Sequence, residues 1–465
     1  MSDIAYDFGL VGLGVMGRNF ILNVADNGFS AIGLDLDKDK VDSLITEGGN
    51  RVVTATQSKE EFVNKLATPR KIMLLVPAGK AVDAVIADLK PLLSEGDIII
   101  DGGNSFFTDT DRRFTELAAD KIHFFGSGVS GGAKGARRGP SIMPGGDKAA
   151  YEHIKPIFEA ASAKVNGEPC VAHLGNGSAG NYVKMVHNGI EYGLMQLISE
   201  VYDLMKRGLG HSNEQLQKTF DSWNKSELQS FLVEITAEIF QQKDDLTDAD
   251  LVDMILDKAK QKGTGKWTSQ NAMDLGIPIP SIDVAVSMRE ISALKSDREK
   301  AQAIYGEHSN GEATIDAEDV KKALLFAFIT TYAQGLNQLV EASKEYDYGL
   351  DLETIAKIWR GGCIIRAALL EDFRKVFTRQ PELSNILLDQ EIAEMVKPLI
   401  ESTTKVVNYS LSQGIPLPAV SASLNYFLAF KSGKLPLNLI QAQRDHFGSH
   451  TYERIDREGI FHTEW

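Results

Sequence analysis

The sequence predicts an α/β N-terminal domain, followed by a large all-α domain with an internal duplication and by a C-terminal tail. A glycine-rich turn stands between a strand pattern and a helix pattern near the N-terminus, which is typical of an α/β sheet protein. Beyond the segment Gly175–Gly180 the chain has long helical patterns and almost no strand signal. Gly433 and Pro436 then interrupt the last helical patterns. We therefore expect domains at residues 1–177 and 178–434 and a tail at residues 435–465.

The first elements are a strand, a glycine turn, a helix and a second strand. Strand patterns cover Ile4–Val11 and Phe29–Leu34, and a helical pattern covers Asn19–Asn27. The G-x-G-x-x-G turn has glycines where a tight turn, a close approach to a pyrophosphate and close helix packing need them. This context predicts a Rossmann-type dinucleotide-binding domain, with the phosphates at the helix N-terminus. The turn residues expected at the dinucleotide are Gly12, Leu13, Gly14, Val15, Met16 and Gly17.

The end of the second strand predicts which dinucleotide is preferred. Asp35 lies about twenty residues beyond the glycines, where a carboxylate accepts hydrogen bonds from the adenosine ribose and repels a 2′-phosphate. Leu36 offers no positive charge to such a phosphate, and Asp37 adds a second negative one. Lys38 and Lys40 follow closely and could reach back toward a phosphate. We therefore expect NAD to be preferred, with NADP as the alternative.

Three further strand patterns end in loops of glycine and polar residues. They cover Lys71–Val76, Ile98–Asp101 and His123–Gly126. Ligands of open parallel sheets lie beyond the carboxyl ends of the strands, although such loops are also typical of ordinary turns. The loop residues expected at the cofactor are Val76, Pro77, Ala78 and Asn104, and those expected at a substrate are Asn104, Ser130, Gly131 and Gly132.

The helical segment Tyr182–Tyr192 carries an unusual set of polar side chains on one face. With Lys184 as origin, the offsets of three, four, seven and eight bring an imidazole, an amide, a carboxylic acid and a phenol to the same side. The members of this stripe are Lys184, His187, Asn188, Glu191 and Tyr192. A solvated helix face is the alternative interpretation, but such a face more often carries several Lys and Glu in pairs.

Composition excludes several classes of function. The formal net charge of -15 argues against a nucleic-acid partner, so an anionic substrate needs a local basic cluster. No apolar run approaches the roughly 20 residues of a membrane span, and the N-terminus has no signal-peptide core. Cys170 and Cys363 are the only cysteines and suit two buried thiols, with no metal-ligand spacing. These features fit a protein of the reducing cytoplasm that needs no metal.

The helical part of the chain contains an internal duplication. G-L-M-Q-L at Gly193–Leu197 returns as G-L-N-Q-L at Gly335–Leu339, a period of about 140 residues. Trp223 has a counterpart in Trp359. The polar stripe is not repeated, because Phe326 and Ala333 stand where the lysine and the glutamate would be. One copy therefore carries the chemistry, and the other serves as scaffold.

Two other segments suggest anion binding and a shared surface. Q-K-G-T-G-K-W is a glycine-spaced basic loop in which Lys262 and Thr264 can hold a phosphate, and Arg289 lies on the next amphipathic helix. The tail carries Arg444, His450 and several aromatic residues, so we expect it to bury itself in a groove of its own chain or of a neighbour.

These segments together resemble the decarboxylating 6-phosphogluconate dehydrogenase family over the whole chain. The matching motifs are the glycine turn, G-G-N-S, S-G-V-S-G-G-A-K-G-A-R-R-G-P-S-I-M-P-G-G, V-K-M-V-H-N-G-I-E-Y-G, K-G-T-G-K-W-T, I-W-R-G-G-C-I-I-R and N-L-I-Q-A-Q-R-D-H-F-G-S-H-T-Y-E. The resemblance implies a homodimer in which each tail penetrates the partner subunit and completes a shared active site. It also implies the pentose phosphate pathway reaction that turns 6-phosphogluconate into ribulose 5-phosphate and carbon dioxide.

The resemblance implies a role for each matching residue. Lys184 would be the general base and Glu191 the general acid. The residues implied at the sugar-acid carboxylate and hydroxyls are Asn104, Ser130, Gly131, Gly132, His187 and Asn188. Those implied at the phosphate are Tyr192, Lys262, Thr264, Arg289 and the partner copy's Arg444, with His450 of that tail closing the site.

Two departures from the family pattern concern the cofactor. Most members carry Asn-Arg-Thr or Asn-Arg-Ser where this chain has D-L-D at positions 35–37, so the arginine that receives the NADP phosphate is missing. Pro77 stands where a lysine is common. Two alternatives stand beside this family: a β-hydroxyacid dehydrogenase, which lacks the second helical copy and the basic tail, and a non-catalytic dinucleotide sensor, which would lack the Lys/Glu pair.

Overall fold

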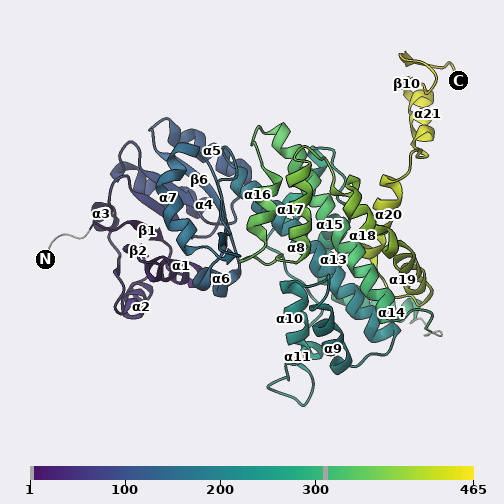
Figure 1. The fold of residues 1–465 in the computed structure, drawn as a ribbon, viewed down its shortest axis with the longest axis horizontal. Coiled ribbons are helices and arrows are strands. Elements are labelled where there is room, and N and C mark those ends of the chain that lie inside the picture. The colour runs from purple at the N-terminus through teal and green to yellow at the C-terminus, as the bar shows by residue number, and fades with distance from the viewer. Residues whose placement is uncertain (1–4, 307–312) are drawn as a thin grey trace.

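The computed structural model describes residues 5–306 and 313–465. An α/β domain and a helical domain lie side by side, and a C-terminal tail projects from the helical domain (Figure 1). The expected fold class is confirmed. Ile4, the start of the first expected strand, lies outside the described residues, and that strand is seen from Phe8. Within the described ranges, no helix combines the length and the apolar character needed to cross a membrane.

A seven-stranded sheet forms the centre of the α/β domain, in the order β3-β2-β1-β4-β5-β6-β7. The first six strands of that order are parallel, and β7 runs antiparallel to β6. The strands are β1 (Phe8–Val11), β2 (Ala31–Leu34), β3 (Val53–Thr56), β4 (Lys71–Leu74), β5 (Ile98–Asp101), β6 (His123–Ser130) and β7 (Ser141–Gly145). A short hairpin, β8 (Lys164–Val165) and β9 (Glu168–Pro169), follows the sheet.

Helices cover both faces of this sheet, because successive side chains of a buried strand point to opposite faces. Phe8 and Leu10 of β1 pack with α1 and α7, whereas Val11 packs with α3 and α4 in a second core cluster. The helices of this domain are α1 (Val15–Asp26), α2 (Lys38–Gly48), α3 (Lys59–Asn64), α4 (Lys80–Leu89), η1 (Lys90–Leu92), α5 (Phe107–Ala118), α6 (Gly132–Arg138) and α7 (Lys148–Ala161).

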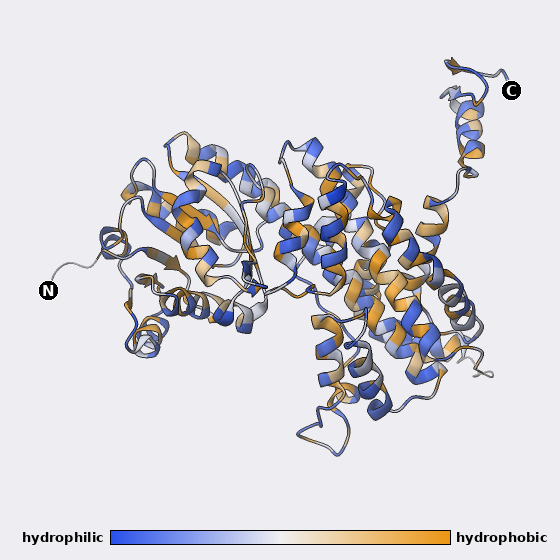
Figure 2. Cartoon of the chain, in the orientation of Figure 1, coloured by the Kyte–Doolittle hydropathy of each residue, from blue (hydrophilic) through white to orange (hydrophobic). Residues whose placement is uncertain are grey.

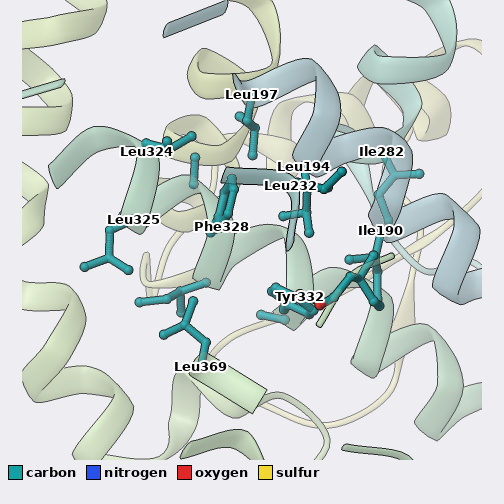
Figure 3. Packing of buried hydrophobic residues seen from close by; sticks show 14 of the residues in the cluster. Ile190, Leu194, Leu197, Leu232, Ile282, Leu324, Leu325, Phe328, Tyr332 and Leu369 are labelled. Atoms are coloured by element: carbon teal, nitrogen blue, oxygen red, sulfur yellow. Dashed lines mark hydrogen bonds between the residues drawn. The ribbon is translucent and has the colours of Figure 1, made fainter. Parts of the chain in front are cut away.

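Two long helices, α8 (Ala179–Asp203) and α15 (Ala317–Glu345), run through the helical domain and pack against each other. Their apolar side chains form the largest core cluster, part of which Figure 3 shows around Leu194, Phe328 and Tyr332. The remaining helices are η2 (Leu204–Gly208), α9 (Asn213–Trp223), α10 (Phe231–Ile239), α11 (Leu251–Met254), α12 (Thr264–Asp274), α13 (Pro280–Ala293), α14 (Lys295–Tyr305), α16 (Leu352–Trp359), α17 (Leu369–Arg379), η3 (Ile386–Leu388), α18 (Gln390–Val396), η4 (Lys397–Leu399), α19 (Ile400–Ser412) and α20 (Pro418–Phe430).

The contact between α8 and α15 reflects the duplication seen in the sequence. A side chain at Gly193 of α8 would collide with Thr331 of α15. In the other direction, a side chain at Gly335 of α15 would collide with Ile190 of α8. The two repeated glycines therefore serve the same purpose in each copy: they let the partner helix approach closely.

The N-terminal half of α8 also packs directly on the edge of the sheet formed by β6 and β7. A Cβ at Gly128 of β6 would overlap the aliphatic part of Lys184, and one at Gly180 of α8 would overlap backbone oxygens of β6 and β7. Glycine at these positions thus brings the lysine-bearing helix onto the carboxyl half of β6. The sheet and α8 together position the site.

The tail forms a small unit of its own, with α21 (Leu437–Gly448) and the hairpin β10 (Tyr452–Glu453) and β11 (Ile460–Phe461). Asp445 is fully buried and accepts hydrogen bonds from the main-chain N–H groups of Thr451 and Thr463 and from the indole of Trp465. In Figure 1 this unit stands clear of the helical body. Apolar bands are visible on it in Figure 2, and Phe447 is 73% exposed.

Most of the expected elements are present. The strand at Ile98–Asp101 has the predicted bounds, and the strand expected at His123–Gly126 continues to Ser130. The helix expected at Asn19–Asn27 begins earlier, at Val15, because it starts directly from the glycine turn. β3 and β7 were not predicted. β3 is only partly buried, and β7 contains Pro144, which weakens its strand pattern.

Candidate active site

One face of α8 carries the predicted polar stripe, and the structure buries it. Lys184 is 5% exposed, His187 is fully buried, and Asn188 is 7% exposed. The Glu191 side chain is 21% exposed and lies one turn farther along the helix. The stripe is therefore not a solvated helix face.

The stripe is connected by hydrogen bonds. The Lys184 amine lies 2.7 Å from the Asn188 Oδ1 and 3.3 Å from the His187 Nδ1. The other imidazole nitrogen of His187, Nε2, lies 3.4 Å from the Ser130 hydroxyl at the end of β6. The nearest Glu191 oxygen lies 3.9 Å from the His187 Nδ1. An amine, an imidazole and a carboxyl group therefore converge beside the loop after β6.

Burial changes the acid–base properties of these groups in useful directions. Burial lowers the pKa of Lys184, although the nearby Glu191 charge opposes this, so part of the amine is neutral at a lower pH than for a free lysine. Burial raises the pKa of Glu191, which keeps more of this carboxyl group protonated. Burial and the Lys184 charge hold the pKa of His187 well below its usual value, so the imidazole is neutral.

The segment 359–364 of the second helical copy packs against His187 of the stripe and against Ser130. The Trp359 ring meets the His187 ring edge to face at 5.5 Å, and the Ile364 N–H lies 3.4 Å from the Ser130 hydroxyl. A side chain at Gly131 would collide with the carbonyl oxygen of Gly362. The I-W-R-G-G-C-I-I-R pattern of this segment is visible in the sequence, but no local signal places it at the site. Only the fold brings it, over two hundred residues away, to the Ser130 loop.

A basic and aromatic patch adjoins the other end of the stripe. The guanidinium of Arg289, on α13, lies 3.5 Å from the centre of the Tyr192 ring. The start of α12 packs against the same ring, because a side chain at Gly265 would collide with it. Thr264 is the first residue of α12, whose N-terminus has no side-chain cap, and Lys262 is exposed just before it. The structure thus gathers Tyr192, Thr264 and Arg289, with Lys262 at the edge.

In the described part of the chain, three predicted substrate residues are exposed on a loop or on the tail: Asn104, Arg444 and His450. Asn104 is exposed on the loop after β5, where Gly103 accepts a hydrogen bond from Asn181 of α8. Arg444 and His450 are exposed on the projecting tail, away from the helical body in Figure 1. The structure therefore does not bring the two tail residues to the site of their own chain.

A cavity of about 590 Å³ lies over the glycine turn, where a dinucleotide is expected. Gly12 has a φ of +95°, which favours glycine, and no side chain caps the N-terminus of α1. The lining also includes a segment that no sequence motif marks, the end of the connection from β3 and the first turn of α3. Its residues are Gln57, Ser58, Lys59 and Glu60. Val76 and Pro77 line the opposite side, and Ala78 is exposed next to them.

The predicted ribose-binding carboxylate lies at the rim of this cavity. Asp35 accepts hydrogen bonds from the main-chain N–H groups of Leu13 at 2.7 Å and of Asp37 at 2.9 Å. Lys40 lies 3.7 Å from Asp35 and 3.6 Å from Asp37. Leu36 is 88% exposed and contributes no charge. The two carboxylates thus hold Lys40, which is one of two lysines lining the cavity, the other being Lys59.

The fold and the site define a class, the dinucleotide-dependent dehydrogenases that join a Rossmann-type sheet to a helical domain. The family described as the NAD binding domain of 6-phosphogluconate dehydrogenase matches residues 7–175, and the family described as the 6-phosphogluconate dehydrogenase C-terminal domain matches residues 180–465. The chain therefore belongs to the 6-phosphogluconate dehydrogenase family.

Individual relatives match nearly the full length. The NADP(+)-dependent decarboxylating 6-phosphogluconate dehydrogenase of Bacillus subtilis is 52% identical over 461 residues, which covers 98% of both chains. The decarboxylating enzyme of Escherichia coli is 48% identical, again over 98% of both chains. The solved 6-phosphogluconate dehydrogenase of Plasmodium falciparum, studied with NADP+ and with 6-phosphogluconate, has a TM-score of 0.96 and 45% identity and covers 99% of this chain and 100% of its own.

Proposed function

We propose that this protein oxidatively decarboxylates 6-phosphogluconate to ribulose 5-phosphate and carbon dioxide, with reduction of a nicotinamide dinucleotide, in the cytoplasm. The observation that carries the proposal is the buried stripe of Lys184, His187, Asn188 and Glu191 on α8, beside Ser130 and next to the Arg289 patch. Membership of the 6-phosphogluconate dehydrogenase family supports it.

In the proposed mechanism, Lys184 and Glu191 move the protons. A neutral Lys184 accepts the proton of the substrate 3-hydroxyl, which its lowered pKa favours. The bound dinucleotide supplies the hydride acceptor. The resulting β-keto acid loses carbon dioxide as Lys184 returns its proton to the ketone oxygen. Glu191, whose raised pKa favours its protonated form, then delivers a proton to carbon 1 of the enediol.

The remaining polar groups bind and orient the substrate in this proposal. Ser130, His187 and Asn188 hold the carboxylate and hydroxyl groups at one end, together with Asn104 and the main chain of Gly131 and Gly132. Arg289, Thr264, Lys262 and Tyr192 hold the phosphate at the other end. An arginine stacked on an aromatic ring is fixed in orientation before a phosphate arrives, which favours bidentate binding.

The glycine turn fits a dinucleotide, because its cavity lies over an uncapped helix N-terminus. We propose that NAD is preferred to NADP by at least about tenfold in kcat/KM, which needs only about 1.4 kcal/mol. In this proposal Asp35, which lines the cavity, accepts the ribose hydroxyls, and Asp37 adds a repulsive charge to any 2′-phosphate. Lys40 and Lys38 are already paired, with Asp35 and Asp37 and with Asp42 respectively.

The test is a steady-state assay with 6-phosphogluconate, run once with NAD and once with NADP. Release of carbon dioxide with either cofactor is expected, and the absence of release with both would refute the proposed reaction. Changing Asp35–Leu36–Asp37 to Asn-Arg-Thr should move the preference toward NADP. If the kcat/KM of the unmodified enzyme for NADP equals or exceeds that for NAD, the proposed preference is wrong. A loss of NADP use in Lys40→Met would then show that this lysine receives the 2′-phosphate.

A further inference from the structure

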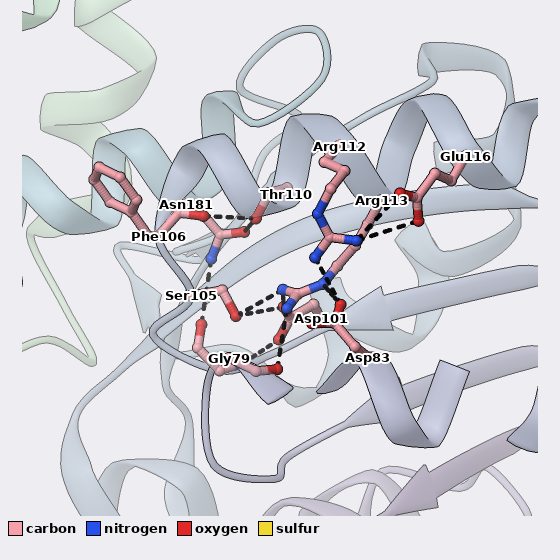
Figure 4. A network of polar contacts seen from close by, with 11 residues as sticks. Gly79, Asp83, Asp101, Ser105, Phe106, Thr110, Arg112, Arg113, Glu116 and Asn181 are labelled. Atoms are coloured by element: carbon pink, nitrogen blue, oxygen red, sulfur yellow. Dashed lines mark hydrogen bonds and ion pairs between the residues drawn. The ribbon is translucent and has the colours of Figure 1, made fainter. Parts of the chain in front are cut away.

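Arg113, in the middle of α5, has a side chain that is only 1% exposed. A buried guanidinium stays charged and needs partners for its N–H groups. Its Nε donates to Asp83 at 2.7 Å, and its Nη2 donates to the carbonyl oxygen of Gly79 at 3.1 Å. Its Nη1 lies 3.3 Å from an Asp101 oxygen and 3.4 Å from the Ser105 hydroxyl. Figure 4 shows this network from close by.

The partners of Arg113 belong to two different loops of the site. Gly79 ends the V-P-A-G loop after β4, which lines the dinucleotide cavity through Val76 and Pro77. Asp101 ends β5, and Ser105 ends the G-G-N-S loop that carries Asn104. One side chain therefore contacts both the loop expected at the cofactor and the loop expected at the substrate.

The second of these loops is wrapped around the Asp101 carboxylate. Asp101 accepts hydrogen bonds from the Ser105 hydroxyl at 2.6 Å and from the Gly103 N–H at 3.0 Å. The Gly103 carbonyl oxygen accepts from Asn181, which lies on α8 one turn before Lys184. The Asn181 oxygen accepts in turn from Thr110 of α5 at 2.9 Å. The network thus continues from Arg113 to the helix that carries the proposed base.

The charges in this network depend on one another. Asp101 is fully buried, and burial raises its pKa, while the Ser105 and Gly103 hydrogen bonds and the Arg113 charge oppose this. Hydrogen bonds from Arg113 and, to a smaller extent, from Arg112 lower the pKa of Asp83 to about 2. Loss of the guanidinium would leave Asp101 as a buried carboxylate without a cation among its contacts, and the loop around it would relax.

We propose that Arg113 is a positioning residue that fixes the spacing between the dinucleotide loop at Val76–Gly79 and the substrate loop at Gly102–Ser105. This proposal rests on the proposed function, since it concerns the two ligands of that reaction. A displacement of about 1 Å in such loops can cost roughly 10²-fold in rate.

The test compares Arg113→Met and Arg113→Lys with Arg112→Met. Arg112 is a matched control, because it lies next in the chain and donates to the same Asp83 oxygen at 2.8 Å, while its other partner among the described residues is Glu116. Arg113→Met should raise the KM of both ligands and lower kcat/KM by roughly 10²-fold. The kcat/KM of Arg113→Lys should lie between those of Arg113→Met and the parent, because a single amine cannot bind the partners in both loops. The kcat/KM of Arg112→Met should stay within about twofold of the parent value.

A binding measurement without substrate separates the possible failures. NADH binding, followed by its fluorescence without any substrate, should weaken in Arg113→Met but not in Arg112→Met. Equal binding and turnover in Arg113→Met and the parent would overturn the proposal, as would equal damage in the two Met variants. If Arg113→Met does not fold, Arg113→Lys and Ser105→Ala are measured in its place. KM values equal to those of the parent in both variants would then overturn the proposal. If the parent is inactive on 6-phosphogluconate but Arg113→Met still weakens NADH binding, the proposed function is refuted while the positioning role of Arg113 at the dinucleotide loop stands.

Discussion

At the scale of single residues, Lys184 gives the most direct test of the mechanism. Lys184→Met should keep substrate binding but lower turnover by roughly 10²–10⁴-fold, the usual effect of removing a general base. The thioether fills much of the same buried volume, so the fold should survive. Steady-state kinetics together with a substrate-binding titration would show this. The control is Lys206→Met on the turn after α8, whose amine pairs with Asp253 outside the stripe. Near-normal turnover of Lys184→Met would remove Lys184 from the mechanism.

The sequence predicted the stripe but not the surroundings of each side chain. Lys184, His187, Asn188 and Glu191 could be assigned to one helix face because helical spacing is regular. Trp359 at the end of α16 and Ile364 in the loop after it could not be assigned, since no local pattern reports a contact between segments so far apart. The same holds for Arg113, which reads in the sequence as an ordinary charge on an amphipathic helix.

At the scale of elements, Glu200 joins α8 to α20 by a cap between helices. Its carboxylate, 3% exposed, accepts hydrogen bonds from the Ala419 and Val420 N–H groups at the start of α20. Burial outweighs these bonds and raises its pKa to about 7. A folded-state pKa above the ordinary value of 4.5 means that the contribution to stability is complete below pH 4.5 and is lost as the pH rises through about 7.

This cap should therefore make the free energy of unfolding depend on pH. Between pH 5 and pH 8 the parent should lose roughly 1–3 kcal/mol relative to Glu200→Gln, in which that titration is absent. Urea unfolding at one fixed protein concentration would measure the difference. Glu214→Gln, at an exposed glutamate that pairs with Lys218, serves as the control and should follow the parent. A parent and a Glu200→Gln variant with parallel pH profiles would contradict the assignment.

The elements themselves were largely predictable, and the exceptions have physical reasons. Long buried helices such as α8 and α15 give strong periodic patterns, and the repeated G-L-x-Q-L motif predicted their relationship. The edge strands β3 and β7 are no shorter than most of the predicted strands, but they mix polar and apolar residues, and β7 contains Pro144, so they give weak signals.

At the scale of the whole molecule, the tail suggests a second copy of the chain. Leu439, Ile440 and Phe447 are more than half exposed on a unit that stands clear of the body in Figure 1. We propose a homodimer in which Arg444 and His450 complete the partner copy's site. Deleting residues from Asn438 onward should abolish activity and weaken dimerisation, as measured by light scattering with the steady-state assay.

A point variant separates assembly from chemistry in this prediction. Arg444→Met should stay dimeric but raise the KM for 6-phosphogluconate. The matched control is Arg454→Met, since this arginine also lies in the tail but pairs with Asp456. A monomeric truncation with full activity would rule out a shared site.

The glycine contact between α8 and β6 has a consequence for protein engineering. Gly128 and Gly180 allow α8 to pack closely on the sheet, and Gly193 allows the same helix to pack closely on α15. The surface of α8 is therefore complementary both to the sheet and to α15. A chimera joined at either end of α8 would combine surfaces that were never selected together. In the sheet, β2 is separated from β6 by β1, β4 and β5. Redesign of cofactor use is therefore better served by substitutions at the end of β2 than by exchange of whole domains between relatives.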